Sequence, residues 1–432
     1  MGLSLPRERV IARAERGNAL NWTGLAAVRG LGSPFLSADL FNTVLLRLGA
    51  TDFVLGLFAL NQIISLPSQF LAARTIDRTE HKVRVAWLAS VAGILPVLLP
   101  LSVLAVTGGK VGMWVFFAAV SGHLLVSQVA GAFNGVAQMD LLSRVLRAER
   151  RGTLFGFQGS LGGLSGILGG LALASVMARL EYPSGFISAW SIGIFLSVGG
   201  SLLLLRLREL PGLRLRRRAV APGMRQAFAA VMEDRRFVVF LVAVVARMGF
   251  GATQYYIWPT ARRLHGLPDE YVGYLVSVNA AIAMISAPGI GWLADRWGRA
   301  ATGLAFSAVA VVGFVLFPQA DGRALLLVAY VLIGIGTSGI TMPLYLSVID
   351  LSPADRRGFY VAVRYGTESA VYMLFLPLFG FISTVTAPHI IFYAGAALAG
   401  LAGIILFRVA MPASHPGGPS HTARSINEHT TR

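Results

Sequence analysis

The sequence predicts an all-α polytopic membrane protein with twelve transmembrane helices. Of its 432 residues, 55% are apolar and only 13% are charged, whereas soluble domains carry about 25% charged residues. The apolar residues gather in long runs separated by short polar turns, and they suffice for about twelve spans of about 20 residues each. This composition excludes an ordinary soluble enzyme and a disordered chain. Because the chain has no Cys, disulfides and thiolate metal sites are excluded as well.

The elements follow one another in a regular order along the chain. No apolar core lies in the first 17 residues, so we expect no cleavable signal peptide. We expect a cytoplasmic N-terminal segment (1–19), six spans (20–205), a basic cytoplasmic linker (206–236), six more spans (237–411) and a disordered cytoplasmic tail (412–432). The predicted spans are 20–46, 53–72, 83–107, 111–139, 153–178, 185–205, 237–260, 271–294, 301–319, 324–349, 359–385 and 388–410.

Basic residues are distributed unequally between the two sides of these spans. Loops on the side of the N-terminus hold 28 of the 37 Lys and Arg, and the opposite loops hold six. The remaining three, Arg29, Arg247 and Arg364, fall inside spans. Because Lys and Arg accumulate in cytoplasmic loops, we expect a cell (inner) membrane protein with both termini in the cytoplasm. The net charge of +17 therefore marks the cytoplasmic face and gives no reason to expect nucleic acid as a partner.

A loop pattern between the eighth and ninth spans has a counterpart between the second and third. The second copy reads G-x-x-x-D-R-x-G-R and consists of Gly291, Asp295, Arg296, Gly298 and Arg299. In the first copy, 218 positions earlier, Asp77 and Arg78 are kept and both glycines are replaced. The same offset separates Arg29 from Arg247, and Asp52 lies 217 positions before Asp269. The chain is therefore an internal repeat of six spans.

Two six-span halves, a basic linker and this loop pattern resemble the major facilitator superfamily of secondary transporters. The resemblance covers residues from about 20 to 410 and implies the fold of that superfamily. In that fold two six-helix bundles with pseudo-twofold symmetry enclose a substrate site near the membrane midplane. The resemblance also implies that the loop pattern is a cytoplasmic gate, because an Asp is stabilised at the start of a helix. Ordinary cytoplasmic charge is the alternative for these residues.

Arg29 and Arg247 are the first candidates for substrate binding. They lie near the middle of the first and seventh spans, where an ionisable side chain is costly unless it faces a cavity or a partner. Two guanidinium groups beside one cavity suit a carboxylate or phosphate. Arginines on these spans also resemble those of the superfamily's organophosphate/phosphate exchangers. Pairing with Asp39, Glu368 or carbonyls, or snorkelling to the interface, is the alternative.

Polar side chains at helical spacing mark further faces that line a path. The resemblance implies that spans 1, 4, 7 and 10 surround it. The remaining substrate-binding candidates are His123, Ser127, Asn134, Gln254, Tyr255, Trp258, Thr337, Thr341 and Tyr345. The alternative is that these residues form hydrogen bonds between helices.

Asp39 and Glu368 are the candidates for proton coupling. Asp39 resembles the acids that proton-coupled members of the superfamily carry in their first span. Glu368 lies four residues after Arg364, so these two charges could instead neutralise each other. We expect coupling to a proton or to a counter-solute.

The sequence thus predicts a secondary transporter that moves a small solute by alternating access. An organic or phosphorylated anion is the first choice of substrate. Proton-coupled efflux of amphipathic drugs is an alternative because 25 Phe could line an apolar site, and a non-transporting receptor or scaffold is another. The sequence contains no metal-ligand cluster, P-loop or nucleophile elbow. We therefore expect no enzyme activity, no cofactor and no metal, and we expect a monomer in the lipid bilayer.

Overall fold

The protein is described here from a computed structural model that covers residues 5–79, 81–145, 148–208, 231–352 and 357–410. Most of the predicted linker and the whole predicted tail lie outside the described residues. The first half consists of α1 (Leu5–Gly32), α2 (Ala38–Arg47), α3 (Asp52–Gly56), α4 (Ser65–Arg78), α5 (Lys82–Ile94), α6 (Leu98–Val106), α7 (Met113–Val145), α8 (Ala148–Arg179) and α9 (Ser184–Ser201). The second half consists of α11 (Arg235–Gln254), α12 (Ile257–His265), α13 (Tyr271–Leu316), α14 (Arg323–Leu351), α15 (Arg357–Val385) and α16 (His389–Ala410).

Short 3-10 turns join several of these helices into continuous spans. They are η1 (Ser33–Leu36), η2 (Leu57–Ile64), η3 (Leu95–Val97), η4 (Leu202–Arg206) and η5 (Phe317–Gln319). Within the described residues, 11 helical segments are long and apolar enough to cross a membrane, and each coincides with a predicted span. Their outward faces carry large exposed apolar side chains such as Phe195 and Leu374, as expected of a surface covered by lipid.

The first predicted span, 20–46, is interrupted instead of continuous. α1 ends at Gly32, the η1 turn contains Pro34, and α2 begins after Ser37, whose backbone is extended. Proline lacks an amide hydrogen and clashes with the preceding turn, so it breaks a helix interior. The span is therefore built from α1 and α2 with a bend between them.

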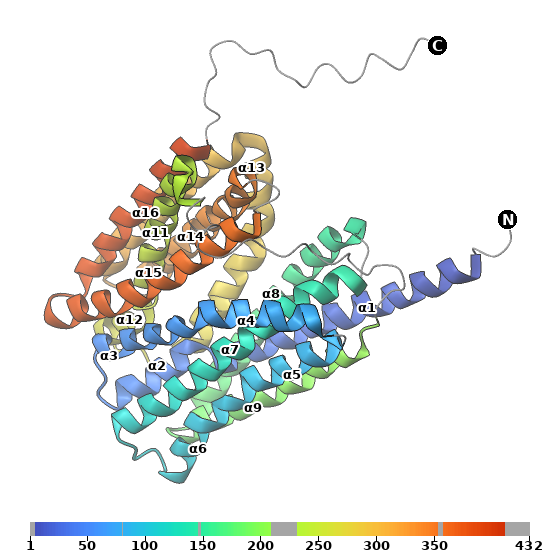
Figure 1. Ribbon diagram of the computed structural model, residues 1–432. Helices are drawn as coiled ribbons and strands as arrows, with labels where there is room; N and C mark the ends of the chain where they lie inside the picture. Colours follow the sequence, from blue (N-terminus) through green and yellow to red (C-terminus); the bar gives the residue numbers. More distant parts are fainter. Residues whose placement is uncertain (1–4, 80, 146–147, 209–230, 353–356, 411–432) are drawn as a thin grey trace, which may run out of the picture.

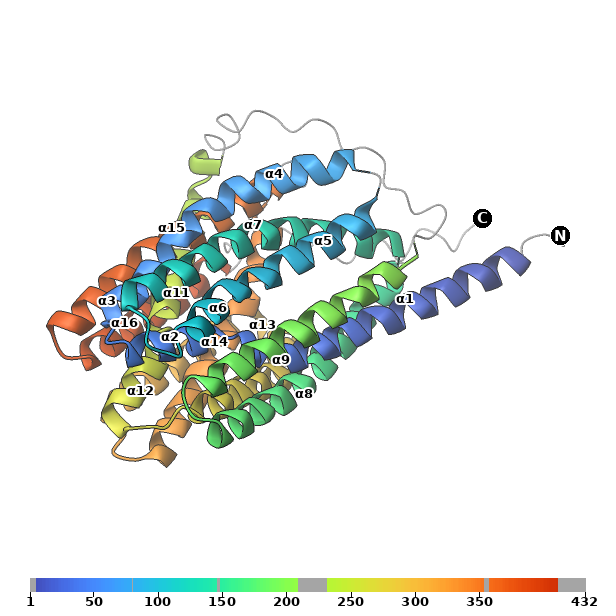
Figure 2. The same ribbon diagram turned by 90° about the horizontal axis from the view of Figure 1, so that it is seen from below.

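The two halves form two bundles that meet at one end of the molecule. In Figures 1 and 2, α2, α3 and α12 lie together at the end away from the N-terminus. We call this the closed end and define it by the turns 48–51 and 266–270; the opposite end, where α1 begins, is the terminal end. In Figure 1 the bundles diverge from the closed end toward the terminal end.

Glycine residues allow the two halves to approach closely where α8 crosses α13. A Cβ on Gly170 would lie 2.7 Å from the carbonyl oxygen of Gly273, and a Cβ on Gly273 would lie 2.4 Å from the backbone nitrogen of Ala174. Small residues at such crossings bring helix backbones together in membranes. Other glycines of α8 face α1, where a Cβ on Gly169 would lie 2.3 Å from the carbonyl oxygen of Leu31.

Candidate functional site

Arg29 is held in place on α1 by neutral groups of the first half. Its Nη1 donates to Oε1 of Gln138 over 3.1 Å, and its Nη2 donates to Oγ of Ser90 over 3.0 Å. Asn134 connects these two partners, because its Oδ1 accepts from Ser90 at 2.8 Å and from Gln138 at 2.6 Å. No acidic side chain pairs with Arg29 in the part of the chain that the structure describes.

Arg247 takes the corresponding place on α11 of the second half. Its Nε and Nη2 donate to Oγ1 of Thr341 over 3.3 and 3.1 Å. Its charge also acts on Glu368 and on Tyr372 of α15. Glu368 forms an ion pair with Arg364, as its spacing indicated. In the second half, Glu368 is therefore paired with Arg364, whereas Arg247 is held by the neutral Thr341.

Other predicted site residues form hydrogen bonds between helices. Gln254 of α11 donates to Oγ1 of Thr337 in α14 over 2.7 Å. Ser127 of α7 donates to the carbonyl of Gly93 in α5 over 2.7 Å, and it lies 3.1 Å from Nδ1 of His123. His123 is buried. These side chains connect helices within each half, and their part in binding a substrate stays a prediction.

Asp39 faces the second half from the first turn of α2. Its side chain is half-buried and has no hydrogen-bond or ion-pair partner among the described residues. The carboxylate of Asp39 interacts electrostatically with the hydroxyls of Tyr255 and Tyr330 in the second half. Because no described side chain occupies its oxygens, Asp39 is available to a proton or to a ligand.

Tyr255 and Trp258 bind the first half directly. The hydroxyl of Tyr255 donates to Oδ1 of Asn42 over 2.8 Å, and Nε1 of Trp258 donates to Oγ1 of Thr43 over 2.8 Å. Both side chains were predicted to bind substrate, and in this conformation they join the halves near the closed end. Nothing in the sequence pattern had marked Asn42 and Thr43 as their partners.

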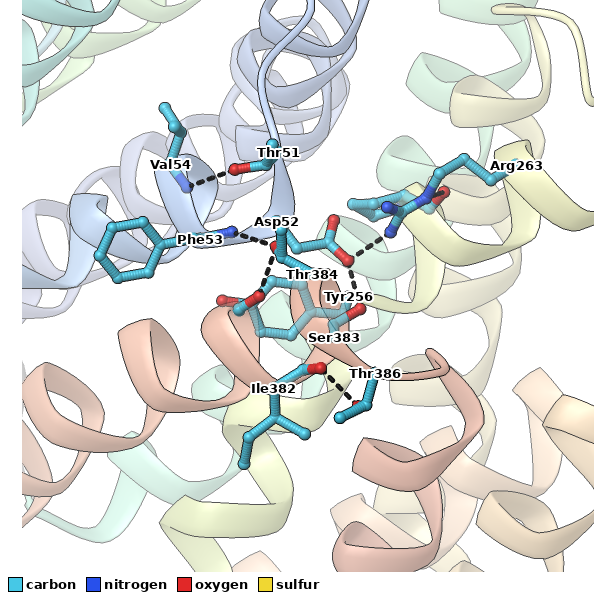
Figure 3. Close-up of polar contacts among 12 residues, drawn as sticks. Thr51, Asp52, Phe53, Val54, Tyr256, Arg263, Ile382, Ser383, Thr384 and Thr386 are labelled. Carbon is cyan, nitrogen blue, oxygen red and sulfur yellow. Dashed lines mark hydrogen bonds and ion pairs between the residues drawn. The ribbon is translucent and has the colours of Figure 1, made fainter.

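Asp52 is the centre of the first ion-pair cluster at the closed end, shown in Figure 3. Its side chain is 0% exposed, and its Oδ2 accepts from Arg263 of α12 and from Ser383 of α15. The amide of Phe53 donates to Oγ1 of Thr384 over 3.3 Å. A residue of the first half is thus held by two helices of the second half. Gly380 permits this approach, because a Cβ there would lie 2.4 Å from the carbonyl oxygen of Asp52.

Asp269 is the centre of a second cluster, in which the acid comes from the second half and a bound arginine from the first. Its Oδ2 accepts from Nε of Arg47 at 2.8 Å and from Nη2 of Arg47 at 2.6 Å, and its Oδ1 lies 2.7 Å from Nη1 of Arg262. The guanidinium of Arg47 also lies 5.3 Å from the ring centre of Tyr182. Burial raises the pKa of the Tyr182 hydroxyl, and the charge of Arg47 acts in the opposite sense.

The repeat relates these two clusters. Each contains an Asp that comes just before or at the start of the second span of its half and an Arg from the other half. Among pairs of described residues, every hydrogen bond or ion pair between the halves involves α2, α3 or residues 255–277. The sequence had shown the offset between Asp52 and Asp269, but their arginine partners were recognised only in the structure.

The loop pattern of the second half contains a sharp turn. Gly298 has φ 80° and ψ 156°, which is not a helical conformation. It therefore separates the eighth and ninth predicted spans, which both lie within α13. Gly291 is half-buried in α13, and the guanidinium of Arg296 lies 5.3 Å from the ring centre of Trp292. The gate role of this pattern, which includes Arg299, stays a prediction. The side chains of Asp77, Arg78, Asp295 and Tyr345 lie outside the described residues.

Comparison with known proteins identifies the family. The Major Facilitator Superfamily matches residues 33–351 and, in a second match, residues 239–428. The chain therefore belongs to the major facilitator superfamily: it is a multi-pass membrane protein of a secondary-transporter family and not an enzyme. Both the predicted fold class and the predicted family are confirmed.

Individual relatives are distant or only partly matched. The chain is 32% identical to myo-inositol transporter 2 of Schizosaccharomyces pombe over 116 residues, which are 26% of this chain and 20% of that relative. The solved nucleoside transporter NupG has a TM-score of 0.71 at 13% identity, covering 91% of this chain and 100% of that one. A bacterial homologue of ferroportin in its inward-facing state has a TM-score of 0.69 at 15% identity, covering 93% and 99%. The outward-facing state of that homologue has a TM-score of 0.63 at 15% identity, covering 92% of this chain and 99% of that one. These structures support the fold alone.

Proposed function

We propose that this protein carries a small organic or phosphorylated anion across the cell membrane by alternating access. Both termini lie on the cytoplasmic side in this proposal, as the distribution of Lys and Arg indicates. Asp39 and Glu368 are the groups through which transport is coupled to a proton, unless transport is an exchange for a counter-solute.

The observation that carries the proposal is the charge of Arg29. Its guanidinium is fixed by Ser90 and Gln138, which are neutral, and no described acid pairs with it. A charge inside a membrane protein is costly without a partner. A carboxylate or phosphate that enters from the terminal end would supply one through charge-assisted hydrogen bonds. Arg247 of the second half is likewise held by a neutral side chain, Thr341.

The arrangement of the halves supports an inward-facing state. The hydrogen bonds and ion pairs between described residues that join the halves lie at or near the closed end, which is the outer side in the proposed topology. The substrate would then leave to, or enter from, the cytoplasm in the present conformation.

A ligand screen followed by counterflow tests this proposal. The purified protein is heated with a panel of carboxylates, organophosphates and hydrophobic cations, and a ligand that binds the folded state raises the melting temperature. We expect stabilisation by anions and subsequent counterflow of the best anion in proteoliposomes. Stabilisation and transport of the cations alone would favour drug efflux. Binding without any exchange would favour a receptor or scaffold, and either outcome would reject the anion proposal.

A further inference from the structure

A pocket lies on the first half at the terminal end, separate from the polar network around Arg29. It has a volume of about 750 Å³ and is formed between α1 and the end of the sixth span. Arg13, Gly17 and Asn21 line it from α1, and Arg206 and Arg208 line it from the other side. Positions 13, 17 and 21 share one face of the helix because they are four residues apart.

The walls of this pocket are fixed to each other by Asn18. Its side chain is 1% exposed. Its Nδ2 donates to the carbonyl of Arg208 over 2.7 Å, and its Oδ1 accepts from the amide of Arg208 over 2.8 Å. The same Nδ2 lies 3.0 Å from the carbonyl of Val145 in α7. The segment that carries Arg206 and Arg208 is therefore held against α1 by a paired backbone contact.

The pocket is strongly positive. Arg13, Arg206 and Arg208 are exposed, and no described residue that lines the pocket is acidic. No ion pair between described residues involves these three arginines. Several guanidinium groups around one hollow concentrate anions, and their planar geometry suits a phosphate.

An apolar surface borders the pocket on the side toward the membrane interior. Leu20 of α1 is 75% exposed, and Leu205, which lines the pocket, is 43% exposed. A free phosphate compound would make no use of these leucines, whereas the acyl chains of a lipid would cover them. Basic pockets between spans on the cytoplasmic side are suited to anionic lipid headgroups.

We propose that this pocket binds the phosphate headgroup of an anionic phospholipid, with the acyl chains along Leu20 and Leu205. The lipid would bridge α1 to the end of the sixth span and stabilise the terminal end of the first half. This site is independent of the transported substrate, so it stands even if the anion proposal for Arg29 fails. It gives three of the cytoplasmic arginines a binding role beyond setting topology.

Thermal unfolding of the full-length protein in detergent tests the proposal with three additions. These are phosphatidylglycerol, phosphatidylcholine with the same acyl chains, and free glycerol phosphate. We expect phosphatidylglycerol to raise the melting temperature more than phosphatidylcholine does, and glycerol phosphate to have no effect. Equal stabilisation by both lipids would overturn the proposal. An equal shift with glycerol phosphate would also overturn it, because the site would then bind a soluble anion.

Two variants locate the effect in the pocket. The double substitution R13Q/R206Q removes two charges, each of which strengthens binding to an anionic lipid by about fivefold, so phosphatidylglycerol should bind about 30-fold more weakly. Gly17→Phe fills the pocket without changing charge, and its Cβ meets no atom within 4 Å. Arg408→Gln, exposed at the end of α16, and Gly289→Phe, also in open space, are the matched controls. A lipid-specific shift that survives in both pocket variants would place the lipid elsewhere and contradict the proposal.

Discussion

Arg47 of the first half and Asp269 of the second form an ion pair in which Nη2 and Oδ2 lie 2.6 Å apart. The repeat produces a reciprocal pair, in which Arg263 of the second half binds Asp52 of the first. Both pairs lie at the closed end, and both must separate if that end is to open. Truncating one partner of a buried pair leaves the other charge without compensation, so these residues hold the closed end together.

The first prediction concerns opening of the closed end. Arg263→Gln leaves the fully buried carboxylate of Asp52 with Ser383 alone, and we expect the closed end to open more often, by about tenfold or more for a lost charge-assisted bond. The chain has no Cys, so Ser277→Cys supplies a unique label. Ser277 is buried and donates to the carbonyl of Ile167 across the halves over 3.1 Å.

The measurement is the rate at which a membrane-impermeant thiol reagent labels this cysteine from the side of the membrane on which the closed end lies. Arg323→Gln is the control, because its guanidinium lies at the same end and donates to Tyr271 of its own half over 2.9 Å. Labelling at the same rate in R263Q and in the control would show that the Asp52 cluster does not hold the end closed.

A second prediction concerns the crossing of α8 and α13. A Cβ on Gly170 would lie 2.7 Å from a carbonyl oxygen of α13, so Gly170→Leu should prevent the halves from meeting there. We expect a folded protein that no longer completes the transport cycle. Gly159→Leu on the same helix is the control, because its Cβ meets no atom within 4 Å. Normal counterflow by the Gly170 variant would mean that this close crossing is dispensable.

A third prediction concerns the turn at Gly298. Its φ of 80° with ψ of 156° is accessible essentially to glycine alone, so Gly298→Ala should destabilise the protein by about 1–3 kcal/mol. The decrease in the melting temperature of the variant in detergent measures this destabilisation, and Gly289→Ala of the same helix is the control. An unchanged melting temperature would show that the turn adopts another geometry.

A fourth prediction concerns the residues that orient Arg29. Ser90→Ala removes one acceptor from the guanidinium and one donor to Asn134. For the anion found in the screen, we expect KM to rise by about tenfold, as for a lost hydrogen bond to a charged group, with kcat little changed. Ser307→Ala, which removes a hydrogen bond to the carbonyl of Ala399 between α13 and α16, is the control. Equal effects of both substitutions would indicate general loosening of the bundle.

Much of the fold could be predicted because membrane spans are encoded locally. Apolar runs located the spans, and the polar turns between them located the boundaries. The bend in the first span was missed because Pro34 stands within an apolar run and does not shorten it. The turn at Gly298 falls in the loop that the sequence pattern placed between the eighth and ninth spans.

The candidate site was less accessible to sequence reasoning because its contacts join distant segments. Arg29 and Arg247 were found because a charge in a span is conspicuous. Ser90 was missed because a single Ser in an apolar span gives no signal of its own. The arginines that bind Asp52 and Asp269 were assigned only to loops, since nothing local marks a partner in the other half.

The most direct test of the central claim is counterflow of the identified anion by Arg29→Gln in proteoliposomes, with Lys110→Gln, an exposed loop residue, as the control. Loss of charge-assisted bonds to the substrate should reduce anion exchange by about tenfold to a hundredfold, while the folded fraction and the behaviour of the control stay normal. Exchange at the wild-type rate in Arg29→Gln would contradict the proposal that this arginine binds the transported anion.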